Sequence, residues 1–375
     1  MQRIESFPEQ LENFENSNLT KSLQDIARNV RVKPNFCIEH PNYKSLKLSV
    51  EVVERLQRLP VETKDKYLNQ QLQFFLYGIY YNGCLVEDLL LSEDSDTLIF
   101  EGNLEDNNFL EIDPEFYQQL HTSNNGRGYF DPGWQVIGID SVDGSLIVKK
   151  DSLTLYIESN LTTEDEFSSS VDNSLMAIKL PKNRVQSGFY GAVGNAGLYS
   201  HSNHPNYQNY VRVYFNLIAE GASAIMDSLT KKLNESCIPF YFKTLYNTFN
   251  YNKRRDCAVL YFEKENYSAV ESVLKFIYLE HQKYFQAKIP LFTKMLAPGL
   301  ALAEEPDLKF SAKESFGQNR CQIVARGLME AERQGIDDPE QRIAKIVQNF
   351  SSLGISLQFP HLNANSEDIY TPFDL

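Results

Sequence analysis

The sequence lacks most features that mark membrane-spanning, secreted and zinc-binding proteins. No run approaches the ~20 apolar residues that cross a bilayer. The start, MQRIESFPEQ, lacks the basic beginning and the apolar core of a signal peptide. The cysteines are dispersed without CxxC spacing, which argues against a disulfide framework and a zinc ribbon. We therefore expect a protein of the reducing cytoplasm with no membrane partner.

Recognisable catalytic motifs are missing too. The chain has no G-x-S-x-G elbow, no H-E-x-x-H pair and no GK[ST] phosphate loop. His201 and His204 lie close together in HSNH, but this polar stretch brings no acidic or cysteine ligand. A solvated loop is predicted there. Hydrolase, metalloenzyme and P-loop functions are not indicated, and we predict no metal site.

Positive charge is scarce overall but concentrated in one part of the chain. The net charge of −14 argues against general nucleic-acid binding. The stretch 84–126 contains acidic residues and no Lys or Arg, a pattern typical of a solvated surface. Between Leu175 and Glu330, by contrast, Lys and Arg outnumber Asp and Glu. A locally basic half of an acidic protein predicts an anionic ligand at a focused site.

Apolar spacing divides the chain into three expected regions. Residues 1–120 predict a helical, acidic N-terminal region, because DKYLNQQLQFFLYGIYYNG places its apolar residues on one helical face. Residues 121–335 alternate strand-like and helix-like runs and predict an anion-binding domain. Residues 336–375 predict a C-terminal helix and tail. The expected fold class is α+β, with a helical N-terminal region followed by a mostly antiparallel sheet that has helices packed on one face.

The clearest pattern lies between residues 210 and 285. YVRVYFNL alternates like a strand, a helix is predicted at about 221–235, and strands IPFYFKTL and CAVLYF precede a helix at 267–285. This β-α-β-β-α order is typical of a sheet covered by helices. Ser315 and Asp338 stand where the N-caps of two further helices are expected.

Glycine recurs at every third position in SGFYGAVGNAGLY. Glycine runs can cradle a phosphate, but this spacing is not G-x-G-x-x-G and no clean strand-to-helix context follows. We therefore predict a mobile or tightly turning loop between two strands, where small residues are needed.

Single cations interrupt four apolar, strand-like runs. They are Lys179 in MAIKLP, Arg212 in YVRVYFNL, Lys243 in IPFYFKTL and Lys294 in IPLFTKMLAPG. A solvent-facing or edge position explains each one taken alone. Taken together, and flanked by aromatic residues, the four fit a shared anion pocket equally well.

Two arginines extend this pattern. Arg255 lies in KRRDC, where Asp256 can orient it through a bidentate pair. Arg320 falls in the first turn of the helix that begins at Ser315, where free amides and the helix dipole favour an anion. A surface position is the alternative explanation for Arg320.

Several ordered stretches resemble the HopA class of type III secretion effectors. They are SGFYGAVGNAG, NYVRVYFNLIAEGASAIMDSLTKKL, IPFYFKTL, RRDCAVLYF, TKMLAPGLALAEEP and ESFGQNRC, and they run from about Asn125 to Glu330. A weaker match lies in the FLYGIYYNG helix. Members of this class act as lyases in the biosynthesis of class V lanthipeptides, where they eliminate phosphate from Ser or Thr residues that a kinase has phosphorylated. The resemblance implies a phosphorylated precursor peptide and a partner kinase, and it implies no cofactor.

This resemblance suggests roles for the residues singled out above. Two or three Arg or Lys hydrogen bonds, at about 1.5–3 kcal/mol each, suit a phosphate with nearly two negative charges. A lysine can remove the α-proton if burial and neighbouring cations lower its pKa to about 7–8. The predicted phosphate ligands are Arg212, Arg255, Arg320 and Lys179. The predicted base is Lys243, with Lys294 as the second choice, and the predicted acid is Tyr214. The predicted peptide-binding loop contains Gly188, Tyr190, Gly191 and Gly194.

The effector members of the same class suggest a second interpretation. The protein would then be a non-catalytic, effector-like or scaffold protein that binds a phosphorylated or acidic partner. This role needs the same cations but no base. Both interpretations predict that the five cations Arg212, Lys243, Arg255, Lys294 and Arg320 converge in the folded chain.

Overall fold

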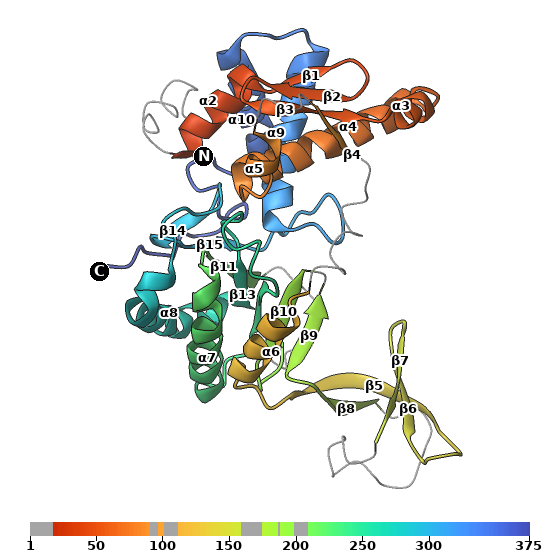
Figure 1. Cartoon of the computed structure of the whole chain (residues 1–375), viewed down its shortest axis with the longest axis vertical. Helices are drawn as coiled ribbons and strands as arrows, with labels where there is room; N and C mark the ends of the chain where they lie inside the picture. The colour runs from red at the N-terminus through yellow and green to blue at the C-terminus, as the bar shows by residue number, and fades with distance from the viewer. Residues whose placement is uncertain (1–17, 91–96, 101–111, 159–174, 187, 199–208) are drawn as a thin grey trace.

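The protein is organised around a seven-stranded antiparallel sheet (Figure 1). Its strand order is β14-β15-β11-β13-β12-β10-β9. The computed structural model describes residues 18–90, 97–100, 112–158, 175–186, 188–198 and 209–375. The strands of this central sheet are β9 (Asn183–Gln186), β10 (Phe189–Val193), β11 (Tyr210–Phe215), β12 (Tyr241–Leu245), β13 (Ala258–Glu263), β14 (Lys294–Ala297) and β15 (Leu300–Glu304).

One face of the central sheet, here called the apolar face, is closed by three helices. Val213, Phe242 and Leu260 project from it into one continuous core, where they meet side chains of the helices such as Ile225 and Leu274. The covering helices are α6 (Pro114–Ser123), α7 (Ala219–Glu235) and α8 (Tyr267–His281), the last with short 3-10 turns on either side, η5 (Lys264–Asn266) and η6 (Gln282–Tyr284).

The opposite face, here called the site face, meets the N-terminal region and α9 (Phe316–Arg333). Tyr214, Val259 and Ala303 project from it into a second core that includes Tyr81 and Phe316. Helices therefore pack on both faces of the sheet, not on one face as expected. The reason is that side chains alternate along a strand, and β11 and β13 carry apolar or aromatic residues on both sides.

The α+β class is confirmed, but the N-terminal region is not purely helical as expected. Three short strands follow α2, and β4 adds to them in parallel with β3. Asn35 and Phe36 both have positive φ and form the tight turn of a hairpin within the region that was expected to be helical. The elements are α2 (Asn18–Asn29), β1 (Arg31–Lys33), β2 (Cys37–His40), β3 (Tyr43–Leu48), α3 (Val50–Gln57), α4 (Val61–Leu76), the π-helical turn η1 (Tyr77–Tyr81), α5 (Val86–Leu89) and β4 (Thr97–Phe100).

The N-caps expected for two late helices are present. The Ser315 side chain forms a capping box with Gln318 at the start of α9. Asp338 caps α10 (Pro339–Ser352) by accepting from the backbone N–H of Gln341 at 3.0 Å. In Figure 1, α10 lies beside α2 although the two are far apart in the sequence. Arg342 joins them by donating to carbonyl oxygens at the end of α2.

A second antiparallel sheet projects from the central sheet like an arm (Figure 1). It has its own small core, which includes Trp134, Val148 and Ile178. Its strands, in the spatial order β7-β6-β5-β8, are β5 (Tyr129–Ile139), β6 (Leu146–Lys150), β7 (Leu153–Ile157) and β8 (Leu175–Leu180).

The expected division of the chain at residues 120 and 335 stays a prediction. Helix α6 spans the first of these boundaries, and Phe116 and Leu120 belong to the core of the apolar face. Among the helices that the structure describes, none is long and apolar enough to cross a bilayer.

Candidate anion site

A cluster of cations and aromatic rings lies on the site face of the central sheet. The Nζ atom of Lys243 is 4.7 Å from the ring centroid of Phe189 and 5.4 Å from that of Tyr261. The guanidinium carbon of Arg212 is 5.0 Å from the Tyr261 centroid, and that of Arg254 is 5.4 Å from the Phe189 centroid. These five residues, here called the cation–ring cluster, alternate positive charge with aromatic faces.

The strand register places these side chains on one face. Arg212 stands directly opposite Tyr261, and Tyr241 of β12 stands opposite Tyr261 on the other side. Lys243 follows Tyr241 by two residues and therefore shares its face. Gly191 of β10 stands opposite Lys243, and a Cβ atom at Gly191 would lie 2.3 Å from the Tyr241 hydroxyl. Glycine thus lets the Tyr241 ring lie against β10.

Tyr261 is the tyrosine of the cluster, and its pKa differs in direction from those of its neighbours. Burial alone would raise the pKa of this phenol, but the positive charges of Arg212 and Lys243 outweigh burial and lower the pKa of Tyr261 below its usual value. Burial raises the pKa of the neighbouring Tyr241 and Tyr214. Tyr261 therefore ionises more readily than either neighbour, as expected for a group that takes part in chemistry.

Two carboxylates hold the arginines of the cluster in place. Glu305 accepts from Arg212 and also from Lys309, and these cations lower the pKa of Glu305 although burial opposes them. Asp256 accepts from Arg254 in a bidentate pair at 2.9 and 3.1 Å. Lys243, in contrast, has no carboxylate within ion-pair distance among the residues that the structure describes. Its positive charge lies beside the rings of Phe189 and Tyr261 instead.

Comparison with known proteins places the cluster within a family segment. Residues 180–362 match the HopA1 effector protein family. The resemblance expected from the sequence is therefore confirmed over this segment, which contains every member of the cation–ring cluster.

Two solved structures, both of effector proteins from Pseudomonas syringae, are also similar to this chain. The protein from pv. tomato strain DC3000 is 16% identical, with 67% of this chain and 81% of that chain covered and a TM-score of 0.40. The protein from pv. syringae strain 61 is 15% identical, with 93% and 98% covered and a TM-score of 0.44. No curated protein matches the chain.

Two of the expected cations lie away from the cluster. Lys294 stands opposite Leu302 in the sheet and so projects toward the apolar face, where its Nζ atom is 2.6 Å from a carboxylate oxygen of Asp368. Lys179 is exposed on β8 of the arm, outside the HopA1-family segment. The sequence pattern did not reveal the register of β14, which decides the face of Lys294.

Two expected phosphate ligands instead hold the backbone. Arg255 donates to the carbonyl oxygen of Tyr80 at 2.8 Å, and the carboxylate of Asp256, expected to pair with Arg255, pairs with Arg254. Arg320 is only 1% exposed and donates to carbonyl oxygens of the C-terminal segment, Pro360 and Leu362, both at 2.8 Å. Burial lowers the pKa of Arg320 to about 10. Neither guanidinium joins the cluster.

The glycine-rich stretch of the HopA1-family segment is not a loop as expected. Residues 189–193 form β10 inside the sheet, because the strand pairs on both sides with β12 and β9. Gly188 precedes the strand with φ +79°, and Gly194 follows it with its backbone N–H bonded to Phe240. Tyr190 points to the apolar face, where Asn124 donates to its hydroxyl at 3.0 Å. Only Gly191 borders the cluster.

Tyr214 is on the expected face but is covered. Its ring centroid lies 6.4 Å from those of Tyr81 and Phe316, and the side chain is 3% exposed. His281 is on α8 and lies 2.7 Å from the Ser228 hydroxyl of α7. Both helices cover the opposite face, so His281 does not border the cluster.

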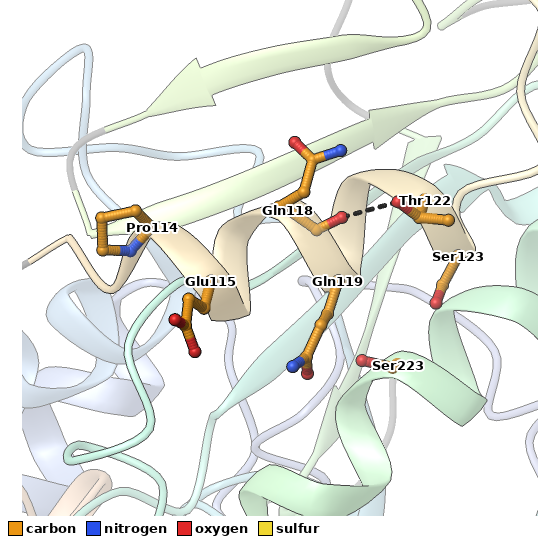
Figure 2. A pocket seen from close by; sticks show the side chains of 7 residues that line it. All are labelled: Pro114, Glu115, Gln118, Gln119, Thr122, Ser123 and Ser223. Carbon is orange, nitrogen blue, oxygen red and sulfur yellow. Dashed lines mark hydrogen bonds between the residues drawn. The ribbon is translucent and has the colours of Figure 1, made fainter.

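A cavity of about 640 Å³ lies apart from the cluster, between α6 and α7 (Figure 2). Apart from Pro114, the side chains labelled in Figure 2 are polar, and none of them is a cation; Thr122 donates to the carbonyl oxygen of Gln118 at 2.9 Å. An anion finds no counter-charge there. Across the described ranges, no three His, Cys, Asp or Glu side chains gather to hold a metal ion, and His201 and His204 lie outside those ranges.

Proposed function

We propose that this protein is a lyase that eliminates phosphate from phosphothreonine or phosphoserine in a peptide. The observation that carries the proposal is the position of Tyr261, whose pKa is lowered, between the cations Arg212 and Lys243. A phosphorylated side chain brings nearly two negative charges, which the cations of the cluster suit. A phenol with a lowered pKa supplies the base that the same reaction needs.

In the proposed reaction, the Tyr261 phenolate takes the α-proton of the phosphorylated residue. The electron pair of the Cα–H bond forms the Cα=Cβ double bond. The Cβ–O bond breaks, and its electrons leave with the phosphate. Arg212 stabilises the phosphate as its charge grows, and Arg254 binds the phosphate equally before and during this step. The products are inorganic phosphate and a peptide that contains dehydroalanine or dehydrobutyrine.

This proposal moves the role of base from Lys243 to its neighbour Tyr261. The positive charges of Arg212 and Lys243 lower the pKa of Tyr261 although burial opposes them, which favours Tyr261 as the group that takes the proton. Lys243 remains essential, because its charge keeps the base ionised and attracts the phosphate.

The proposed partners are a phosphorylated precursor peptide and the kinase that modifies it. A second candidate function is binding of a phosphorylated partner without turnover, as an effector-like or scaffold protein. One observation favours it: Glu305 and Asp256 already pair with the two arginines of the cluster, which fixes the arginines but contributes no acid or base.

The test uses the full chain and peptides that contain phosphothreonine or phosphoserine. We expect release of inorganic phosphate and a peptide lighter by one phosphoric acid. Tyr261→Phe should lower turnover by about 10²–10⁴-fold and leave peptide binding intact. The matched control is Tyr241→Phe, which removes a hydroxyl from the adjacent ring, 5.7 Å away on the same face. It should keep most of the turnover.

The outcomes separate the two functions. Phosphopeptide binding without phosphate release in the unmodified protein would overturn the lyase and support the binding role. Equal losses in Tyr261→Phe and Tyr241→Phe would show that ring packing matters and that Tyr261 is not the base.

A further inference from the structure

The segment that carries Arg254 is fixed to the π-helical turn η1 of the N-terminal region. The Arg255 side chain donates to the carbonyl oxygen of Tyr80 at 2.8 Å, and its backbone N–H donates to that of Asn82 at 2.9 Å. The Tyr77 hydroxyl lies 3.4 Å from a carboxylate oxygen of Asp256. Two consecutive residues of the loop before β13, Arg255 and Asp256, are thus tied to this turn and the residue that follows it.

The turn is shaped to receive these contacts. A π-helical turn carries one extra residue and often occurs at functional sites. Gly83, just beyond it, has φ +82°, and a Cβ atom there would lie 3.3 Å from the Nε atom of Arg255. Glycine therefore provides both the backbone conformation and the space for the Arg255 guanidinium.

The result is an Arg254 side chain with a defined direction. Asp256 engages its Nε and one terminal nitrogen, while the other terminal nitrogen has no hydrogen-bond partner among the described residues. The guanidinium is half-buried and lies beside the Phe189 ring that Lys243 also contacts. A donor left over beside a second cation is suited to a phosphate oxygen.

We infer that η1 completes the phosphate site, with Tyr77, Arg255 and Asp256 acting as positioning residues that direct Arg254 at the phosphate. This inference rests on the proposed function and extends it, because Tyr77 lies outside the family segment 180–362. A chain that kept the family segment but lost η1 would keep Arg212, Lys243 and Tyr261. Its Arg254 side chain would no longer be held in a fixed direction toward the phosphate.

The simpler explanation is that these contacts only join the N-terminal region to the sheet. It predicts that weakening them lowers stability and leaves the phosphate site of the folded protein unchanged. The positioning role predicts a change in substrate binding in folded protein. An interaction made equally with substrate and transition state affects KM and not kcat, so a rise in KM at nearly constant kcat identifies it.

The experiment compares three variants of the full chain. Asp256→Asn should raise KM for a phosphothreonine peptide about tenfold, and Tyr77→Phe about threefold, with kcat within twofold. The Kd of inorganic phosphate, measured by calorimetry, should rise in parallel. The control is Tyr80→Phe, a hydroxyl loss in the same turn on a side chain that donates to Asp25 instead, at 2.7 Å. Its KM and Kd should stay unchanged.

Each outcome decides the question. If the unmodified protein turns over the peptide and Tyr77→Phe and Asp256→Asn match it in KM and phosphate Kd, the inference is wrong while the proposed function stands. If Tyr80→Phe raises KM as much as Tyr77→Phe, general loosening of η1 replaces the positioning role. If the unmodified protein neither binds phosphate nor releases it, the proposed function fails and the inference with it. Tyr77→Phe decides the matter alone should Asp256→Asn not fold.

Discussion

The two faces of the central sheet use the same strands for different purposes. In β12, Phe242 is fully buried against α7 and α8, while the next residue, Lys243, is half-buried among rings on the site face. In β11, Val213 likewise projects into the core of the apolar face, and the adjacent Arg212 lies beside a ring on the site face. The apolar face supplies stability through burial, and the site face has charge that burial would ordinarily disfavour. The difference shows that one strand, whose side chains alternate between the faces, can contribute apolar residues to the core and charged residues to the candidate site.

The largest expected effects come from adjacent residues on opposite faces. Phe242→Ala should lower the free energy of unfolding by about 3–5 kcal/mol, because it leaves a cavity under the helices. Lys243→Ala should change it by under about 1 kcal/mol but should lower turnover of a phosphothreonine peptide about 10²-fold or more. Urea unfolding and phosphate release measure the two effects. A large stability loss in Lys243→Ala would break the division between the faces.

Part of this arrangement could be predicted from the sequence. Alternation in YVRVYFNL places Arg212 and Tyr214 on one side, and the class α+β follows from the order of strands and helices. The sequence could not show that Tyr261 stands between Arg212 and Tyr241, because that depends on the register of three strands far apart in the chain. The lowered pKa of Tyr261 is a property of this register.

A second comparison uses the neighbours Glu304 and Glu305. Glu304 accepts from Lys264 and Tyr370 and fastens the C-terminal segment, whereas Glu305 accepts from Arg212 at the cluster. Each substitution by Gln should cost about 1.5–3 kcal/mol. The two substitutions should differ in their effect on the pH dependence of turnover. Glu305 raises the pKa of Tyr261, so Glu305→Gln should move the rising limb of the pH–turnover profile to lower pH, and Glu304→Gln should not move it.

The stability of the protein at acid pH tests the charges assigned to Glu304 and Glu305. The folded-state pKa of each glutamate is lowered, despite burial, by its partners. The stabilisation is present above the unfolded value of about 4.3 and is lost as pH falls through the folded value. The free energies of unfolding of the unmodified protein and of both Gln variants, measured in urea, should therefore differ at pH 7 and converge as the pH falls through the folded-state pKa. A gap that persists in acid would contradict the assigned charges.

A smaller effect is expected where the site face admits only glycine. Gly191→Ala would place a Cβ atom 2.3 Å from the hydroxyl of Tyr241, so that ring must move, at a cost of about 1–3 kcal/mol. The control is Gly138→Ala in β5, where the nearest atom, of Ile147, is 3.7 Å away. It should change stability by under about 0.5 kcal/mol. Equal stability of the two variants would show that Tyr241 does not depend on the glycine.

The adjacent residues Arg254 and Arg255 have different partners that the sequence does not predict. KRRDC offers two arginines before one aspartate, and the sequence does not say which one the aspartate holds. The contact of Arg255 with Tyr80, over 170 positions earlier in the chain, turns Arg255 away and leaves Arg254 to Asp256. Tertiary contacts of this kind have no local pattern, so only the folded chain assigns them.

The smallest effect is expected from a substitution on the apolar face, away from the cation–ring cluster. Lys294 projects toward the apolar face and pairs with Asp368, both partly exposed. Lys294→Ala should cost under about 1 kcal/mol and change kcat and KM by under about twofold, since the cation borders no part of the cluster. Asp368→Asn should cost a similar amount, and the double variant should add little to either. A turnover loss in Lys294→Ala that equals the loss in Lys243→Ala would mean that both cations serve one site, and the separation of the faces would fail.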